Sequence, residues 1–162
     1  MSNANIEIQS LAGLVESNAK SLASWLDQIK ALFQDQLQLQ VDLGCVSALN
    51  NNNANYIYVC VDRASQSVNA AMILSFQPKV RRCIILRLAV ATPFQRRRIG
   101  TRMLEQAART AREHDCNELF LAPLNENTHV WYERSGFAPV NNEKKYWSLN
   151  LDAATLGISH FY

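Results

Sequence analysis

The chain has 162 residues, of which 48% are hydrophobic and 19% charged, and its formal net charge is +2. This length suits one domain with a sizeable core, and this composition is typical of soluble globular proteins. The small net charge does not by itself indicate a nucleic-acid or membrane partner, and no apolar run reaches the length of a membrane span. The N-terminus, MSNANIEI, has neither the basic segment nor the apolar core of a signal peptide, so we expect a cytoplasmic location.

The first half of the chain predicts two helices and three strands. Apolar residues at helical spacing alternate with runs rich in β-branched and aromatic residues. The expected elements are a strand at 6–9, a helix at about 19–36 with a turn before it, a short helix at 42–49, and strands at 56–62 and 68–76 joined by a turn at 64–67. Pro78 should end the last of these strands, because proline cannot donate to a strand ladder.

An apolar run from Cys83 to Ala91, broken only by Arg87, begins the central part of the chain. Such a run predicts a strand buried on both faces. After a short loop and three arginines, apolar residues recur every four positions from Ile99, which predicts an amphipathic helix. A strand, a tight basic loop and a helix in this order predict an anion site, because the first amides of a helix lack intrahelical partners and the helix dipole is positive there.

The last third predicts a strand at 118–122 stopped by Pro123, a short helix from Asn127 or Thr128 to Arg134 with Gly136 at its C-cap, and a strand at 146–151. Hairpin signals precede a strand–helix–strand unit, so the sheet should be mixed. The four cysteines, Cys45, Cys60, Cys83 and Cys116, form no C-x-x-C pair, so no metal site is expected. Three of the four lie in or beside apolar segments and are interpreted as core residues.

The segment from Cys83 to Phe137 resembles the acetyl-CoA-binding core of the GNAT superfamily of N-acetyltransferases. That family has Gln or Arg, two residues, Gly, one residue, then Gly or Ala; Gln95 and Gly100 match, and Arg98 stands in place of the first glycine. Further along, the family has Asn, Tyr, Gly and Phe at a spacing that Asn125, Tyr132, Gly136 and Phe137 reproduce. Arginine fits the glycine position readily only if the loop keeps helical φ there.

The resemblance implies one α/β acetyltransferase domain over residues 1–162, best supported at 56–151. Its mixed central sheet would be flanked by helices, with the fourth and fifth strands splayed apart. Acetyl-CoA would be the co-substrate. The implied cofactor-binding residues are Gln95, Arg96, Arg97, Arg98, Ile99, Gly100 and Thr101 at the pyrophosphate, Leu88 and Val90 at the thioester carbonyl, and Asn125 and Tyr132 further along. Tyr132 would be the catalytic general acid that protonates the departing CoA thiolate.

The general base is not evident, because no carboxylate lies between Lys79 and Gly100. Water, a backbone carbonyl or Asp62 are the alternatives. Arg87 either selects an acidic acceptor or makes internal hydrogen bonds, since a buried guanidinium requires a partner. His129 is interpreted as a packing or solvated residue.

Three functions fit these residues. The favoured one is direct transfer of the acetyl group, in a ternary complex, to a primary amine of a small molecule or a protein. The alternative is a non-catalytic acetyl-CoA sensor or interaction module. Nucleic-acid binding through the three arginines is disfavoured because no aromatic residues are interleaved with them. We therefore expect an amine acceptor as partner, no nucleic acid, no membrane, and a monomer or homodimer.

Overall fold

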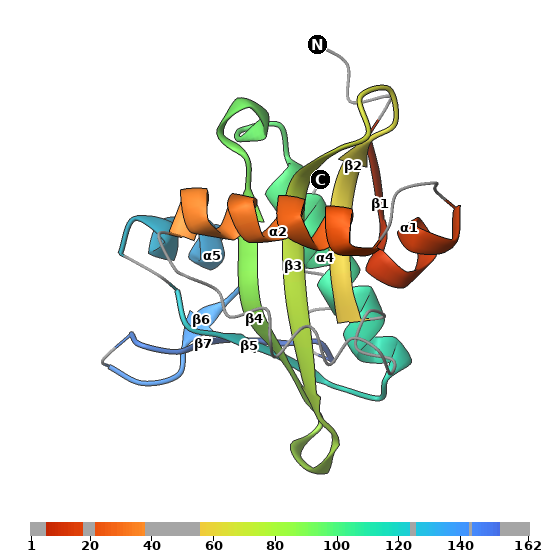
Figure 1. The fold of residues 1–162 in the computed structure, drawn as a ribbon. Coiled ribbons are helices and arrows are strands. Elements are labelled where there is room, and N and C mark those ends of the chain that lie inside the picture. Colours follow the sequence, from red (N-terminus) through yellow and green to blue (C-terminus); the bar gives the residue numbers. More distant parts are fainter. Residues whose placement is uncertain (1–5, 18–21, 38–55, 124–125, 143, 153–162) are drawn as a thin grey trace. The chain divides into compact units, whose positions relative to one another are not determined.

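The computed structural model describes residues 6–17, 22–37, 56–123, 126–142 and 144–152 (Figure 1). Its elements are β1 (Ile6–Ser10), α1 (Leu11–Ser17), α2 (Leu22–Leu37), β2 (Ile57–Asp62), β3 (Ser67–Gln77), η3 (Pro78–Val80), β4 (Arg82–Val90), η4 (Thr92–Phe94), α4 (Ile99–Glu113), β5 (Glu118–Leu121), η5 (Glu126–Thr128), α5 (His129–Arg134), β6 (Ala138–Pro139) and β7 (Trp147–Asn150). Among these helices, none has the length and apolar character needed to cross a membrane. The helix expected at 42–49 and the tail beyond Asp152 lie outside the described residues.

The strands form one seven-stranded sheet in the order β1-β2-β3-β4-β5-β7-β6. β1 and β2 pair antiparallel, as do β2 and β3, whereas β4 and β5 pair parallel. β7 then pairs antiparallel with β5 and with β6. The predicted mixed sheet is therefore confirmed; only β6, two residues long, was not anticipated. The β4–β5 register runs from the pair Arg82–Glu118 to the pair Ile84–Phe120, and β4 continues beyond it to Val90.

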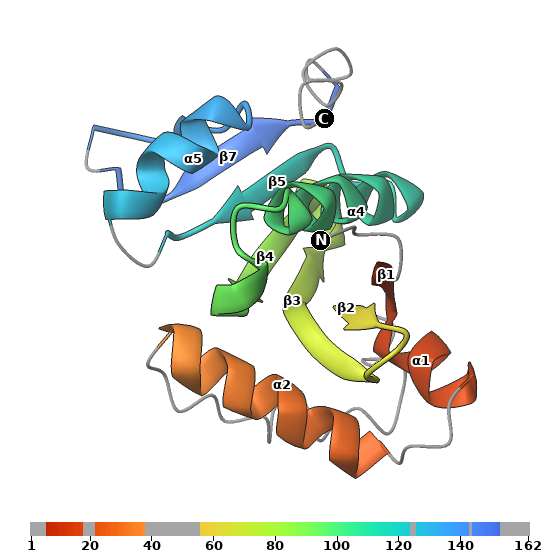
Figure 2. The same cartoon turned by 90° about the horizontal axis from the view of Figure 1, so that it is seen from above.

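The described residues fall into two compact units. The first contains the residues up to Ile73 together with Arg87–Met103, and the second contains Leu74–Leu86 and the residues from Leu104 onward. The first unit holds a hydrophobic cluster to which α1, α2, β2 and β3 all contribute. Its members include Leu11, Leu14, Trp25, Ile29, Phe33, Ile57 and Val59. Figure 2 shows α2 running across one face of β2 and β3, which is the face that this cluster fills.

Where a turn was expected before α2, the structure has a true helix, α1. Leu11 and Leu14 are buried one turn apart, and the side-chain oxygen of Ser10 accepts the amide hydrogen of Gly13 at 3.1 Å. This bond satisfies one of the unpaired amides at the helix start, as an N-cap serine does. The cap and the buried pair together explain why so short a segment is helical.

The second unit buries one ridge of α4 and alternate residues of β5 and β7. These residues are Leu104, Ala107, Ala108, Ala111, Leu119, Leu121, Trp147 and Leu149. Across the two units Cys60, Cys83 and Cys116 are all buried, as predicted, while Cys45 lies outside the described residues. Burial raises the pKa of Cys60 and of Cys83 to about 12, so both thiols stay protonated and unreactive near neutral pH.

The prediction that β4 is buried on both faces is wrong. Cys83, Ile85 and Ala89 are buried, but Leu86 is 45% exposed and Arg87 is also exposed. An apolar sequence is buried on both faces only where another element covers each face, and the composition of a strand does not specify its neighbours. The two successive exposed residues mark the place where the regular alternation of β4 is interrupted.

A bulge in β3 lies beside the end of β4. The β2–β3 register shifts between Cys60 and Val61, so that Asn69 is an extra residue in β3. The carbonyl of Asn69 accepts the amide hydrogen of Ala91 at 2.8 Å. The amide of Val68, the residue before Asn69, donates to the side-chain oxygen of Gln28 at 3.1 Å. This bond connects α2 to the bulge.

Candidate functional site

The basic loop between β4 and α4 has an unusual backbone. Gln95 is extended, with φ −67°, whereas Arg96 and Arg98 have φ of +64° and +61°. Arg97 between them does not share this left-handed conformation, and Ile99 is already helical. When successive residues alternate in handedness, their amide hydrogens converge into a concave anion site. The left-handed φ of Arg96 and of Arg98 fits such a nest, and phosphate binding by this loop stays a prediction.

The start of α4 adds further donors to this loop. The amide of Arg102 donates to the carbonyl of Arg98 at 3.0 Å, which makes Arg98 the N-cap residue. The amides of Ile99, Gly100 and Thr101 then have no intrahelical acceptor, and the helix dipole places partial positive charge beside them. An arginine side chain has no oxygen that could accept these amide hydrogens, so Arg98 does not cap the helix with its own side chain.

Arg98 does not have the helical φ at which an arginine would fit readily in place of glycine. Helical φ would have suited an arginine, but the observed φ of +61° is the conformation that favours glycine. A β-carbon in this conformation costs about 1–2 kcal/mol. The loop thus keeps the backbone of a glycine at this position although the residue is arginine.

We expect Arg98→Gly to stabilise the fold by up to about 1 kcal/mol. The substitution removes the strain, but glycine loses more conformational entropy on folding, and this cost of about 0.5–1 kcal/mol offsets part of the gain. Arg98→Ala, which keeps a β-carbon, should leave the melting temperature unchanged. Both variants should bind CoA within about threefold of the parent if the backbone alone holds the phosphate. A loss in both variants that shrinks at high salt would show instead that the guanidinium contacts a phosphate.

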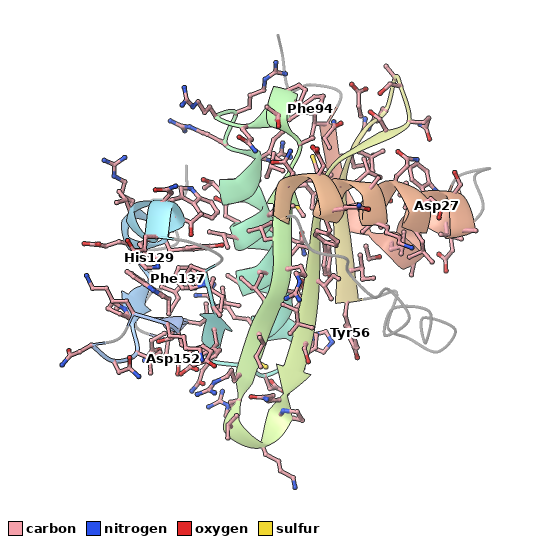
Figure 3. All side chains as sticks on the ribbon, turned by 60° about the vertical axis from the view of Figure 1, so that its left-hand side comes forward. Asp27, Tyr56, Phe94, His129, Phe137 and Asp152 are labelled. Atoms are coloured by element: carbon pink, nitrogen blue, oxygen red, sulfur yellow. The ribbon has the colours of Figure 1, made fainter. Side chains whose placement is uncertain are left out.

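The Gln95 side chain is directed back to the end of β4 and to α2. Its amide nitrogen donates to the carbonyl of Val90 at 3.0 Å and to the side-chain oxygen of Gln36 at 2.9 Å. Figure 3 labels Phe94 beside this loop, and the Arg97 guanidinium lies 5.3 Å from the centre of that ring. Gln95 therefore holds the shape of the loop, with its amide hydrogens already used within the protein.

Leu88 and Val90 are half-buried at the end of β4, past the exposed pair Leu86 and Arg87. The carbonyl of Val90 is the one that Gln95 uses. A donor to a thioester carbonyl from this part of β4 stays a prediction. Because Arg87 is exposed, the requirement for an anionic partner that a buried guanidinium would impose does not apply to it.

Tyr132 lies on α5 in the second unit, and the end of that helix holds it firmly. The amide of Phe137 donates to the carbonyl of Tyr132 and the amide of Gly136 to that of Glu133, both at 3.0 Å. With φ of +100° at Gly136, this is a Schellman motif, so the predicted glycine C-cap is present. The rings of Tyr132 and Phe137 meet edge to face with centroids 5.6 Å apart.

Burial dominates the chemistry of the Tyr132 phenol. Tyr132 is only 8% exposed, and the loss of solvation raises the pKa of its phenol to about 12. The phenol is therefore neutral over the whole physiological range and carries the proton that a general acid must give. Tyr132 and the basic loop belong to different units.

Of the other residues singled out in the sequence, His129 and Asp62 make contacts within the fold. His129 packs against Trp147 with ring centroids 5.0 Å apart, and Figure 3 labels it at the start of α5. A side-chain oxygen of Asp62 accepts the amides of Ala64 and Ser65 in the β2–β3 turn, which weighs against Asp62 as a general base. Asn125 lies outside the described residues.

Comparison with solved structures identifies the fold. A chain of the NatC complex bound to Gag peptide and CoA is 20% identical, with a TM-score of 0.69 over 91% of this chain and 99% of that chain. An acetyltransferase of the GNAT family from Staphylococcus aureus Mu50 is 14% identical, with a TM-score of 0.67 over 90% and 99%. Nourseothricin acetyltransferase is 18% identical, with a TM-score of 0.52, and the match covers 59% of this chain and 64% of that one. The fold is that of an acetyltransferase.

The sequence itself leads to the family. Residues 20–137 match the family described as the acetyltransferase (GNAT) family. The chain therefore belongs to the GNAT family of acetyltransferases, which confirms the resemblance and assigns it to the acyltransferase class of enzymes. Among curated proteins, no sequence matches the chain significantly.

Gln36 is the residue of this region that sequence reasoning missed. It lies 59 positions from Gln95 and has the ordinary appearance of a polar residue on an amphipathic helix. The left-handed φ of Arg96 was also not foreseen, because arginine carries no local signal for that conformation.

Proposed function

We propose that this protein binds acetyl-CoA and transfers its acetyl group directly to a primary amine of a small molecule or a peptide. The observation that carries the proposal is the loop from Arg96 to Thr101, where two left-handed residues lead into the first turn of α4; this arrangement supports an anion site rich in arginine. A diphosphate matches such a site in charge and hydrogen-bonding chemistry. Among the neighbours, NatC is bound to a peptide and CoA, and another is named for acetylating the small molecule nourseothricin, so both acceptor classes are kept.

In the proposed reaction a neutral amine attacks the thioester carbonyl, a carbon–nitrogen bond forms, and the carbon–sulfur bond breaks. The chain contributes at three points. The loop amides hold the cofactor phosphates, an amide from Leu88 to Val90 donates to the carbonyl oxygen as it gains charge, and Tyr132 gives its proton to the leaving thiolate. The amine nitrogen becomes positively charged on attack and loses its proton to water, and Tyr132 regains a proton from solvent after it has protonated the thiolate. Asp62 is not given the role of base, because it already accepts the amides of the β2–β3 turn.

A second function, a non-catalytic acetyl-CoA sensor, is favoured by one specific observation. The chain has no carboxylate between Lys79 and Gly100, the stretch that includes β4. An enzyme without a dedicated base remains able to act on amines that are partly neutral at the working pH, so this observation does not displace the first proposal.

The test combines ligand binding with turnover. A ligand that binds only the folded state stabilises it by about 2.7 kcal/mol at a hundredfold excess over its Kd, which corresponds to several degrees in Tm. We expect acetyl-CoA to give this shift and ATP a smaller one. Release of free CoA thiol across a panel of amines, amino acids and peptides should then identify the acceptor.

The outcomes of this experiment separate the candidates. A thermal shift without turnover on any amine would favour the sensor. No shift at millimolar acetyl-CoA would refute acetyl-CoA binding altogether.

A further inference from the structure

We propose that Gln36, at the end of α2, is a positioning residue that holds the cofactor loop in the conformation that binds an anion. The affinity for acetyl-CoA then depends on the position of α2. The inference rests on the proposed function, since it concerns the same loop. Gln36 is hydrogen-bonded to Thr92 and Gln95, and it acts on the loop through them.

Gln36 bridges two points of the segment that leads into the loop. Its side-chain nitrogen donates to the hydroxyl oxygen of Thr92 at 2.9 Å, and its side-chain oxygen accepts from Gln95 at 2.9 Å. Gln95 in turn donates to the carbonyl of Val90 at 3.0 Å. One helix residue thus links the last residue of β4, the η4 turn and the residue that immediately precedes Arg96.

The orientation of the Gln36 amide follows from its surroundings. Its nitrogen also lies 3.0 Å from a carboxylate oxygen of Asp35, which can only accept a hydrogen bond when ionised. If the amide were turned over, its oxygen would face that carboxylate and its nitrogen would face the nitrogen of Gln95, so two repulsive contacts would replace two bonds. The network has one consistent arrangement.

The loop needs such support because its useful conformation is strained. Arg96 and Arg98 both hold left-handed φ, each at a cost of about 1–2 kcal/mol for a residue with a β-carbon. Such conformations persist only where surrounding contacts determine them. Gln95 is the residue before the first strained position, and its side chain is held from both ends by Val90 and Gln36.

A second connection ties α2 to the same segment. Gln28, two turns before Gln36 on α2, accepts the amide of Val68 at the β3 bulge, and the bulge residue Asn69 accepts the amide of Ala91. The chain from Ala91 to Gln95 is therefore held to α2 directly through Gln36 and indirectly through the bulge. Movement of α2 would release both.

The test is CoA binding by calorimetry and steady-state kinetics for Gln36→Ala, with Gln34→Ala as the matched control. Gln34 is the same residue type two positions away and is exposed on α2. We expect Gln36→Ala to raise the Kd for CoA and the KM for acetyl-CoA about three- to tenfold, the range of one or two lost hydrogen bonds, with kcat at saturating acetyl-CoA unchanged. Gln34→Ala should match the parent in all three constants.

A double-mutant cycle shows whether Gln36 acts through Gln95. In a Gln95→Ala background, Gln36→Ala should raise the Kd by a smaller factor than it does in the parent, because one of its two partners is already gone and only the bond to Thr92 is left to lose. The inference is overturned if Gln36→Ala binds CoA as the parent does, if its effect is undiminished in the Gln95→Ala background, or if kcat falls while KM is unchanged. If the parent itself fails to bind CoA, the proposed function is what fails.

Discussion

Tyr132→Phe should lower kcat by about 10²- to 10³-fold at neutral pH while leaving the KM for acetyl-CoA nearly unchanged. General acid catalysis contributes about 10²–10⁴-fold, and a thiolate is a good enough leaving group to place the effect at the lower end. Only an interaction made as the carbon–sulfur bond breaks is lost, and such a loss appears in kcat. Phenylalanine keeps the ring and its edge-to-face contact with Phe137, so the fold should be retained.

The pH dependence adds a second measurement. Because burial raises the pKa of Tyr132 to about 12, the phenol keeps its proton as the pH rises through the range in which an exposed tyrosine, of pKa about 10, would lose it. The kcat of the parent should therefore show no fall attributable to phenol ionisation below about pH 10. Any activity lost on the acidic side should reflect protonation of the acceptor amine.

Tyr146→Phe is the matched control for this substitution. Tyr146 is 36% exposed and stacks on Phe120 with ring centroids 5.2 Å apart, so it too can lose a hydroxyl without losing its packing. Its kcat should equal that of the parent. If Tyr132→Phe also turns over at the parental rate while chemistry limits the rate, Tyr132 is a packing residue and another group protonates the thiolate.

Gly100→Glu should abolish acetyl-CoA binding, with the Kd raised about a hundredfold or more. The carboxylate would lie in the first turn of α4, where the proposed diphosphate binds. Like charges about 4 Å apart repel by about 4 kcal/mol at an effective dielectric constant of 20, before screening by salt. The same carboxylate should stabilise the free protein, because an acidic residue at a helix N-terminus interacts favourably with the dipole.

Opposite signs for stability and binding make this substitution decisive. Gly100→Ala is its control: alanine gains about 1 kcal/mol of helix propensity over glycine and adds no charge, so it should raise Tm and keep acetyl-CoA affinity. The thermal shift caused by acetyl-CoA is the measurement for both variants. A normal shift in Gly100→Glu would place the cofactor phosphates elsewhere on the protein.

Local patterns were enough to predict most elements and the region of the site. The four-residue apolar repeat from Ile99 corresponds to a buried ridge of α4, since Ile99, Met103, Ala107 and Ala111 are all inaccessible to solvent. The run from Asn125 to Phe137 correctly predicted α5 and its glycine cap, because a helix end is encoded by the few residues that form it. Fold class and family followed from these short-range signals at known separations.

Tertiary structure alone decided the features that depend on partners distant in sequence. The exposure of Leu86 and Arg87 depends on which elements cover β4, and the left-handed φ of Arg96 and Arg98 depends on contacts that outweigh their own preference. The bond between Gln36 and Gln95 joins residues 59 positions apart, and neither residue type signals it. The sequence by itself determined most of the helices and strands and the family. Long-range packing determined how the loop between β4 and α4 is held.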